Sequence, residues 1–120
     1  MVVDPKYIDY WRQVRAEQQI AQQQAKKLAW QEVNAIASVL RQQFGATRVM
    51  VFGSLLSDRF QDDSDLDIAA APIPKARFFE AVAAVNECSQ RWVDLKPLDD
   101  LDPYFKQRVL DTGLDIHGPD

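Results

Sequence analysis

Apolar positions along the chain recur with two different spacings, and each spacing predicts a different kind of element. Over residues 28–44 they return every three or four residues, as on one face of an amphipathic helix. Asp4 and Pro5 form a typical helix start, Gly45 supplies a stop, and no Gly or Pro lies between Pro5 and Gly45. An unbroken helix of this length would span roughly 60 Å. We therefore expect part of it to project or kink. The apolar stripe consists of Leu28, Ala29, Val33, Ile36, Ala37, Leu40 and Phe44.

The N-terminal part of this predicted helix differs in character from the rest. Residues 12–27 are mostly polar and contain six glutamines, and an apolar, aromatic cluster precedes and overlaps them. The members of the cluster are Tyr7, Ile8, Tyr10, Trp11 and Val14. A projecting helix cannot bury such a cluster alone, so it either folds back on its own domain, docks on a second copy in a homodimer, or binds another protein. The first two interpretations are favoured, and the sequence divides into a helical extension over 1–27 and one domain over 28–120.

The rest of the chain alternates between predicted strands and helices. A β-branched apolar run over residues 49–52 reads as a buried strand, and a second run follows at 66–69. Helical spacing returns over 75–91, with inward positions at or near Phe78, Phe79, Val82, Val85 and Cys88. Three further elements are predicted. They are a strand over 92–96, a short helix that begins at Asp102-Pro103 and ends at Gly113, and an edge strand over 114–116.

Composition narrows the class of protein. With 47% hydrophobic and 27% charged residues, and no long apolar run, the chain is expected to be a globular, cytoplasmic protein rather than a membrane protein. The single cysteine, Cys88, excludes an intrachain disulfide. A net charge of −4 argues against broad nucleic-acid binding, which depends on clustered Lys and Arg.

Two aspartates, Asp65 and Asp67, lie one residue apart at the second predicted strand. Side chains alternate along a strand, so both carboxylates are expected on one face while Leu66 and Ile68 point into the core. Paired carboxylates repel unless a cation neutralises them. Oxygen ligands favour a hard divalent ion, so Mg²⁺, with Mn²⁺ as the alternative, is the predicted metal.

Gly53 and Ser54 follow the first predicted strand directly. Backbone amides in such a turn, together with the Ser54 hydroxyl, can hold a phosphate oxygen. Asp94, in the third predicted strand, is placed to complete a triad of carboxylates, and three carboxylates can bind two metal ions. It could bridge to the second metal or accept a proton, although a lone strand acid often simply faces water. Asp62 and Asp63 are interpreted as solvated loop charges without a role.

One motif resembles the signature of the DNA polymerase β-like nucleotidyltransferase superfamily. It consists of Gly53-Ser54, a spacer of ten residues, and Asp65-Leu66-Asp67. The short chain resembles the minimal nucleotidyltransferases that are antitoxin partners of HEPN-domain ribonuclease toxins. Members often carry a basic residue about three positions after the serine, where this chain has Ser57. The resemblance covers about residues 28–117.

The resemblance implies an α+β fold, in which a small mixed sheet like the polymerase β palm has helices packed on one side, and to which the long N-terminal helix is added. It implies a nucleotidyltransferase domain over 28–120. It also implies metal-binding acids at Asp65, Asp67 and Asp94, which form the catalytic set, and nucleotide binding by Gly53, Ser54, Asp65 and Asp67.

The implied activity is Mg²⁺-dependent transfer of AMP from ATP to a tyrosine of the HEPN toxin, which silences its RNase activity in a type VII-like toxin–antitoxin pair. Two alternatives remain open at this point. One is a binding antitoxin whose site is vestigial, and the other is a nucleotidyltransferase acting on a small molecule such as an aminoglycoside.

Overall fold

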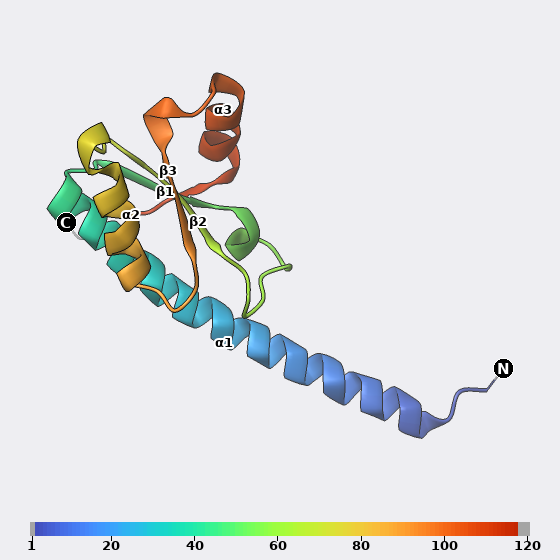
Figure 1. Ribbon diagram of the computed structural model, residues 1–120. Helices are drawn as coiled ribbons and strands as arrows, with labels where there is room; N and C mark the ends of the chain where they lie inside the picture. Colours follow the sequence, from blue (N-terminus) through green and yellow to red (C-terminus); the bar gives the residue numbers. More distant parts are fainter. Residues whose placement is uncertain (1, 118–120) are drawn as a thin grey trace.

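The computed structural model describes residues 2–117 and is built around a four-stranded mixed sheet (Figure 1). The strands are β1 (Arg48–Phe52), β2 (Leu66–Ala71), β3 (Val93–Pro97) and β4 (Leu114–Asp115), in the spatial order β3-β2-β1-β4. β1 pairs antiparallel with β2 and with β4, whereas β2 pairs parallel with β3. The last three residues of the predicted domain over 28–120 lie outside the described residues.

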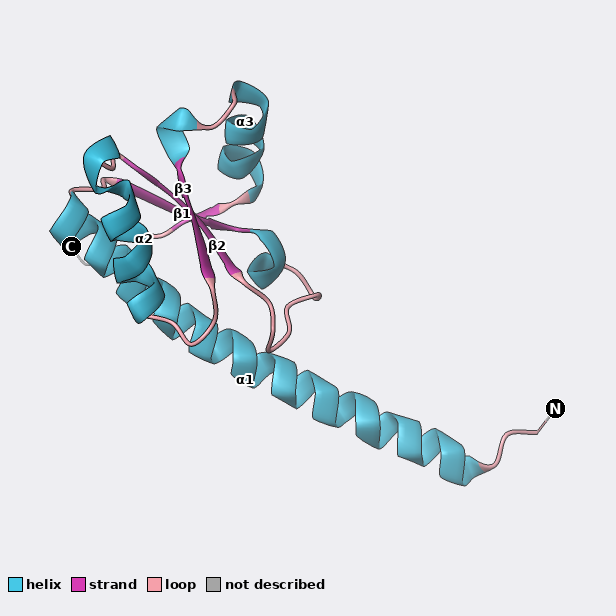
Figure 2. Cartoon of the chain, viewed as in Figure 1, coloured by secondary structure: helices cyan, strands magenta, loops and turns pink. Residues whose placement is uncertain are grey.

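A single helix, α1 (Pro5–Phe44), forms the N-terminal third of the chain. The Asp4 carboxylate accepts a hydrogen bond from the Lys6 amide, and Gly45 ends the helix in the left-handed conformation with φ of 76°. The helix is unbroken, so its N-terminal part projects beyond the sheet (Figures 1 and 2), and the molecule measures 64 × 29 × 27 Å. The predicted helix start, stop and projection are therefore confirmed.

Two helices cover one face of the sheet. The C-terminal part of α1 and helix α2 (Phe78–Glu87) pack on the side chains that alternate inward from the three long strands. These strand residues are Val49, Val51, Leu66, Ile68, Ala70, Val93 and Leu95. All but Leu95 are fully buried, so this face is the main hydrophobic core, and the predicted α+β sheet with helices packed against it is confirmed.

The opposite face also carries a helix, whereas helices were predicted on one side only, and this helix forms a smaller apolar cluster with the sheet. Helix α3 (Pro103–Thr112) and the turn η3 (Leu98–Asp100) pack there on Met50 and Ala69, which alternate with the residues of the main core. The strand residues of this cluster are Met50, Phe52, Ala69 and Ala71, so Asp67 and Asp94 lie outside it. Polar side chains of β2 and β3 can therefore lie on the part of this face that the apolar cluster leaves uncovered.

Three details of the hydrophobic pattern were predicted wrongly. Leu28 belongs to the predicted stripe but is 41% exposed, because Ala25, Ala29 and Val33 form the buried side of the helix and Leu28 lies at its margin. Phe79 is 84% exposed, because the turn η2 (Lys75–Arg77) precedes α2 and shifts its inward positions to Phe78, Ala81 and Val85. Trp92 lies just before β3 rather than within it, although the predicted strand covers 92–96.

Candidate active site

The predicted phosphate-binding residues lie in a tight turn at the end of β1. The chain leaves Phe52 and enters the turn η1 (Gly53–Leu56) with φ of +78° at Gly53, a conformation that L side chains rarely adopt. A Cβ at this position would overlap Oδ2 of Asp67. Glycine is thus needed for the turn and for the close approach of the Asp67 carboxylate to it.

Ser57 ends this turn, and the structure gives it a local role. Its backbone amide and its hydroxyl both donate to the carbonyl oxygen of Ser54, at 2.9 and 3.0 Å, and its hydroxyl accepts from the Arg59 amide. A serine at this position therefore closes the turn through side-chain hydrogen bonds, which a basic residue could not do in the same way.

Asp67 and Asp94 face each other across the parallel pair of strands. They are register partners in β2 and β3, and both alternate away from the main core, onto the same face of the sheet as Ala69. Both side chains are partly exposed. The structure therefore brings together two of the three predicted acids by backbone pairing alone.

Asp65 is positioned differently from the prediction. It lies just before the first residue of β2, in an exposed segment, so strand alternation does not fix its side chain on the face of Asp67. Its carboxylate is nevertheless near enough to Asp67 to affect the ionisation of that residue. The roles of Asp65, Asp67 and Asp94 as a metal-binding and catalytic set stay a prediction.

The electrostatics of this end of the sheet are dominated by negative charge. Burial raises the pKa of Asp67 above its ordinary value, the carboxylates of Asp94 and Asp65 raise it further, and Lys96 opposes them. The Lys96 ammonium lies 3.4 Å from Oδ2 of Asp94. Three carboxylates face one ammonium group, so a bound cation would relieve the repulsion at Asp67.

The donor chemistry fits a hard divalent cation, because every nearby ligand candidate is a carboxylate oxygen. Within residues 2–117, however, no three His, Cys, Asp or Glu side chains converge closely enough to form a ligand cluster. A bound cation would stabilise the ionised carboxylate of Asp67 most, since this residue combines burial with two carboxylate neighbours.

Arg91, which was not predicted as a functional residue, positions the segment that precedes Asp65. Nη1 of Arg91 donates to the carbonyl oxygens of Gln61 and Ser64, at 3.0 and 2.7 Å, and its guanidinium lies 4.5 Å from the ring centre of the buried Phe60. The segment before β3 thereby fixes the segment before β2. No spacing in the sequence could reveal this contact, because its partners are 27 and 30 residues away.

The mixed sheet has a glycine-serine turn that lies against Asp67, and Asp67 is paired with Asp94 on the adjacent strand, an arrangement typical of a nucleotidyltransferase fold. The comparison with protein families gives the same answer, since the model of "Polymerase beta, Nucleotidyltransferase" matches residues 34–120. The chain therefore belongs to the polymerase β nucleotidyltransferase family. Residues before 34 lie outside the match.

A solved structure supports the fold. It is described as a mutant of the toxin-antitoxin MntA-HpeT, and it matches with a TM-score of 0.57 at 20% identity, over 72% of this chain and 73% of that chain. No match was found among curated proteins. None of the helices in residues 2–117 is both long enough and apolar enough to cross a membrane.

Proposed function

We propose that this protein is a cytoplasmic antitoxin that transfers AMP from ATP to a tyrosine of a HEPN-domain RNase toxin, in a reaction that depends on Mg²⁺. The observation that carries the proposal is the pairing of Asp67 with Asp94 on adjacent strands, with the Asp67 carboxylate against the Gly53 turn. Mn²⁺ could replace Mg²⁺, because the ligands are hard oxygen donors.

In this proposal each element of the site has one task. The amides of the Gly53-Ser54 turn and the Ser54 hydroxyl bind oxygens of the triphosphate, as backbone donors do in other phosphate-binding turns. Asp65 and Asp67 hold the metal, and Asp94 accepts the proton of the incoming hydroxyl group. When bound, the metal supplies positive charge that stabilises the phosphate oxygens and the leaving group.

The transfer itself needs a proton acceptor. A bond forms between the acceptor's hydroxyl oxygen and the α-phosphorus, the bond from that phosphorus to the bridging oxygen breaks, and pyrophosphate leaves. The hydroxyl proton passes to the carboxylate of Asp94, which is partly exposed and therefore accessible to an incoming hydroxyl group. Lys96 remains beside Asp94 and keeps its orientation.

The similarity to a structure described as a toxin-antitoxin supports a protein toxin as the acceptor. That structure is described as carrying glutamate in place of two aspartates that are one residue apart, the spacing of Asp65 and Asp67 here. This spacing supports the importance of the pair in the proposed reaction.

The direct test mixes the protein with ATP, Mg²⁺ and the product of the neighbouring gene, and weighs the partner by intact mass spectrometry. We expect a mass increase of one or more adenylyl groups, located on tyrosine by fragmentation. Asp67→Asn should abolish it, whereas Asp62→Asn, in the exposed loop, should retain it. An unmodified partner with the unaltered protein would overturn the proposal.

The same variants separate catalysis from simple binding. If Asp67→Asn neutralises the toxin as well as the unaltered protein does, without modifying it, the antitoxin acts by binding. Adenylation of an aminoglycoside by the protein alone would instead favour a small-molecule acceptor.

A further inference from the structure

The part of α1 that projects from the domain, here called the arm (residues 5–21), leaves large apolar side chains exposed. Tyr7 is 64% exposed and Trp11 is 58% exposed. Gln22 is the first residue of α1, within the described chain, whose side chain is hydrogen bonded outside the helix, to the carbonyl oxygens of Asp58 and Phe60. The predicted folding back of the aromatic cluster on its own domain is therefore wrong.

The arm presents the same side of the helix that the domain covers further along. Positions 7, 11, 14, 18, 22, 25 and 29 follow at intervals of three or four residues, and Ala25 and Ala29 are buried against the domain. Near the end of the arm this side forms a concavity lined by the apolar residues Val3, Tyr7, Ile8 and Trp11 and by Arg12 and Arg15. The exposed apolar surface is thus a continuation of the core-facing side of α1.

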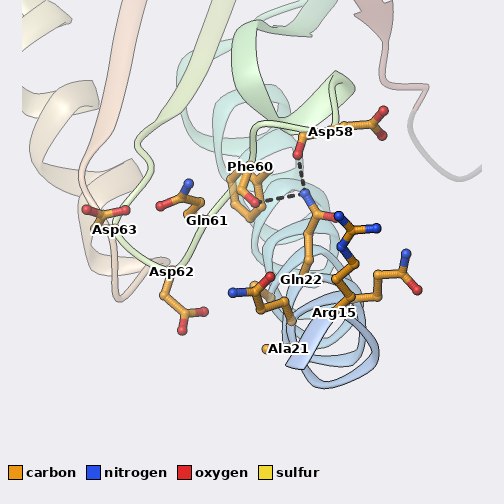
Figure 3. A pocket seen from close by; sticks show the side chains of 11 residues that line it. Arg15, Ala21, Gln22, Asp58, Phe60, Gln61, Asp62 and Asp63 are labelled. Atoms are coloured by element: carbon orange, nitrogen blue, oxygen red, sulfur yellow. Dashed lines mark hydrogen bonds between the residues drawn. The ribbon is translucent and has the colours of Figure 1, made fainter. Parts of the chain in front are cut away.

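A groove begins where this surface meets the domain. One wall of the groove is α1 from Arg15 to Ala25, and the other is the loop from Asp58 to Asp63 (Figure 3). Three carboxylates, those of Asp58, Asp62 and Asp63, line the loop side. A helix that covered the arm's apolar surface would continue into this acidic groove.

Charge indicates which helix fits. The arm, residues 5–21, contains three Lys or Arg against two Asp or Glu, whereas residues 22–120 contain eleven against fifteen. The net charges of the two parts are therefore +1 and −4. Arg12 and Arg15 of the arm are opposite in charge to the acidic loop, and Arg15 also lines the helix side of the groove in its own chain.

We propose that the arm of a second copy of this chain occupies the groove, so that two arms pair antiparallel around a two-fold axis. In this arrangement Trp11 and Tyr7 of each arm are covered by the other copy, and Arg12 and Arg15 of each arm approach Asp62 and Asp63 of the other. Because of the two-fold axis, the arm of each copy lies in the groove of the other, and the two contacts are identical. Neither arm is then left exposed. The dimer does not depend on the proposed catalytic function.

The first test is the mass of the protein alone, measured by sedimentation equilibrium at micromolar concentrations. We expect twice the chain mass. Trp11→Glu should weaken association by at least roughly tenfold, because a central aromatic residue would be lost from the interface. Ile20→Glu is the matched control, since Ile20 is also an exposed apolar residue of the arm but lies nine residues away, on the opposite side of the helix.

The second test reverses charges in separate copies. The variant Arg12→Glu/Arg15→Glu and the variant Asp62→Lys/Asp63→Lys should each be mostly monomeric, because like charges then meet in both contacts. An equimolar mixture should form heterodimers, because every arm then meets a loop of opposite charge.

Three results would overturn the proposal. These are an unaltered protein that is monomeric alone, an equal effect of Ile20→Glu and Trp11→Glu, or a mixture of the two charge variants that stays monomeric. A monomer that associates only with a different protein belongs to the first of these results. Circular dichroism of each variant confirms that α1 is still helical.

Discussion

The two faces of the sheet differ in what their side chains contribute. The face toward α1 and α2 carries only apolar strand residues, of which Leu66, Ile68 and Val93 are fully buried. On the other face the same strands carry Asp67, Asp94 and Lys96 beside a smaller apolar cluster. Because side chains alternate, one strand stabilises the fold with every second residue and presents charges with the others. Changes on the two faces should therefore have separable effects on stability and on activity.

The largest effect on stability is expected on the apolar face. Ile68→Ala should lower the free energy of unfolding by about 2 to 5 kcal/mol, because it leaves a cavity among residues that cannot collapse into it. Urea denaturation followed by circular dichroism measures this loss. Phe79→Ala, at a position that is 84% exposed, should cost under about 0.5 kcal/mol. Similar losses at the two positions would contradict the assignment of the core.

The next effect concerns Arg91, which connects the segments that precede β2 and β3. Arg91→Ala should cost about 1 to 2 kcal/mol, through two hydrogen bonds and the contact with Phe60. It should also lower AMP transfer by roughly tenfold, because Asp65 is then less well positioned. Stability is measured by urea denaturation and the reaction by initial rates over a range of Mg²⁺ concentrations.

Arg77→Ala is the matched control for Arg91. Its guanidinium also lies 4.5 Å from a phenyl ring, that of Phe44, and it donates to a backbone carbonyl, that of Gln43. We expect a similar loss of stability with an unchanged rate of transfer. If both variants lose activity equally, Arg91 acts only through global stability.

Gly53 and Gly45 offer a closer comparison, because both have φ near +77°. Substitution of either by Ala should cost about 1 kcal/mol, owing to the left-handed conformation. A Cβ at Gly45 meets nothing within 4 Å, whereas at Gly53 it displaces the Asp67 carboxylate. Only Gly53→Ala should therefore weaken the affinity for Mn²⁺, which isothermal titration calorimetry measures. Equal affinities in the two variants would contradict a metal-binding role for Asp67.

The smallest effect has the opposite sign. The pKa of Asp67 is raised, so without metal its ionised form destabilises the fold at neutral pH. This penalty shrinks as the pH falls below the raised pKa and is gone below the ordinary pKa of an aspartate. Asp67→Asn should stabilise the metal-free protein by a few tenths of a kcal/mol near pH 7, since the carboxylate is only half-buried and water screens it.

Thermal unfolding in EDTA at several pH values checks this expectation. The difference in Tm between Asp67→Asn and the unaltered protein should shrink toward pH 4 as Asp67 becomes protonated. Asp100→Asn, at an exposed position of η3, serves as the control and should show no such trend. A destabilised Asp67→Asn at neutral pH would show that the carboxylate has a structural role.

The local features of this protein could be predicted from its sequence because neighbouring residues determine them. Asp4-Pro5 and Gly45 set the ends of α1 through hydrogen bonds and dihedral preferences within a few residues. The strand that ends at Gly53, the alternation of Leu66 and Ile68, and the helix capped by Asp102 follow from equally local patterns. The family resemblance rested on such a local motif, and the family match confirmed it.

Tertiary structure decided what depends on distant segments. Strand pairing sets Asp94 opposite Asp67 and leaves Asp65 outside β2. Loop packing brings Arg91 into contact with residues about thirty positions away. The arm also combines a feature that the sequence determines with one that only the tertiary structure shows. Its helix could be read from the sequence, but only the structure shows that its apolar side continues the core-facing side of α1 beyond the domain. Helical periodicity is a local property, whereas burial depends on which other part of the chain lies alongside.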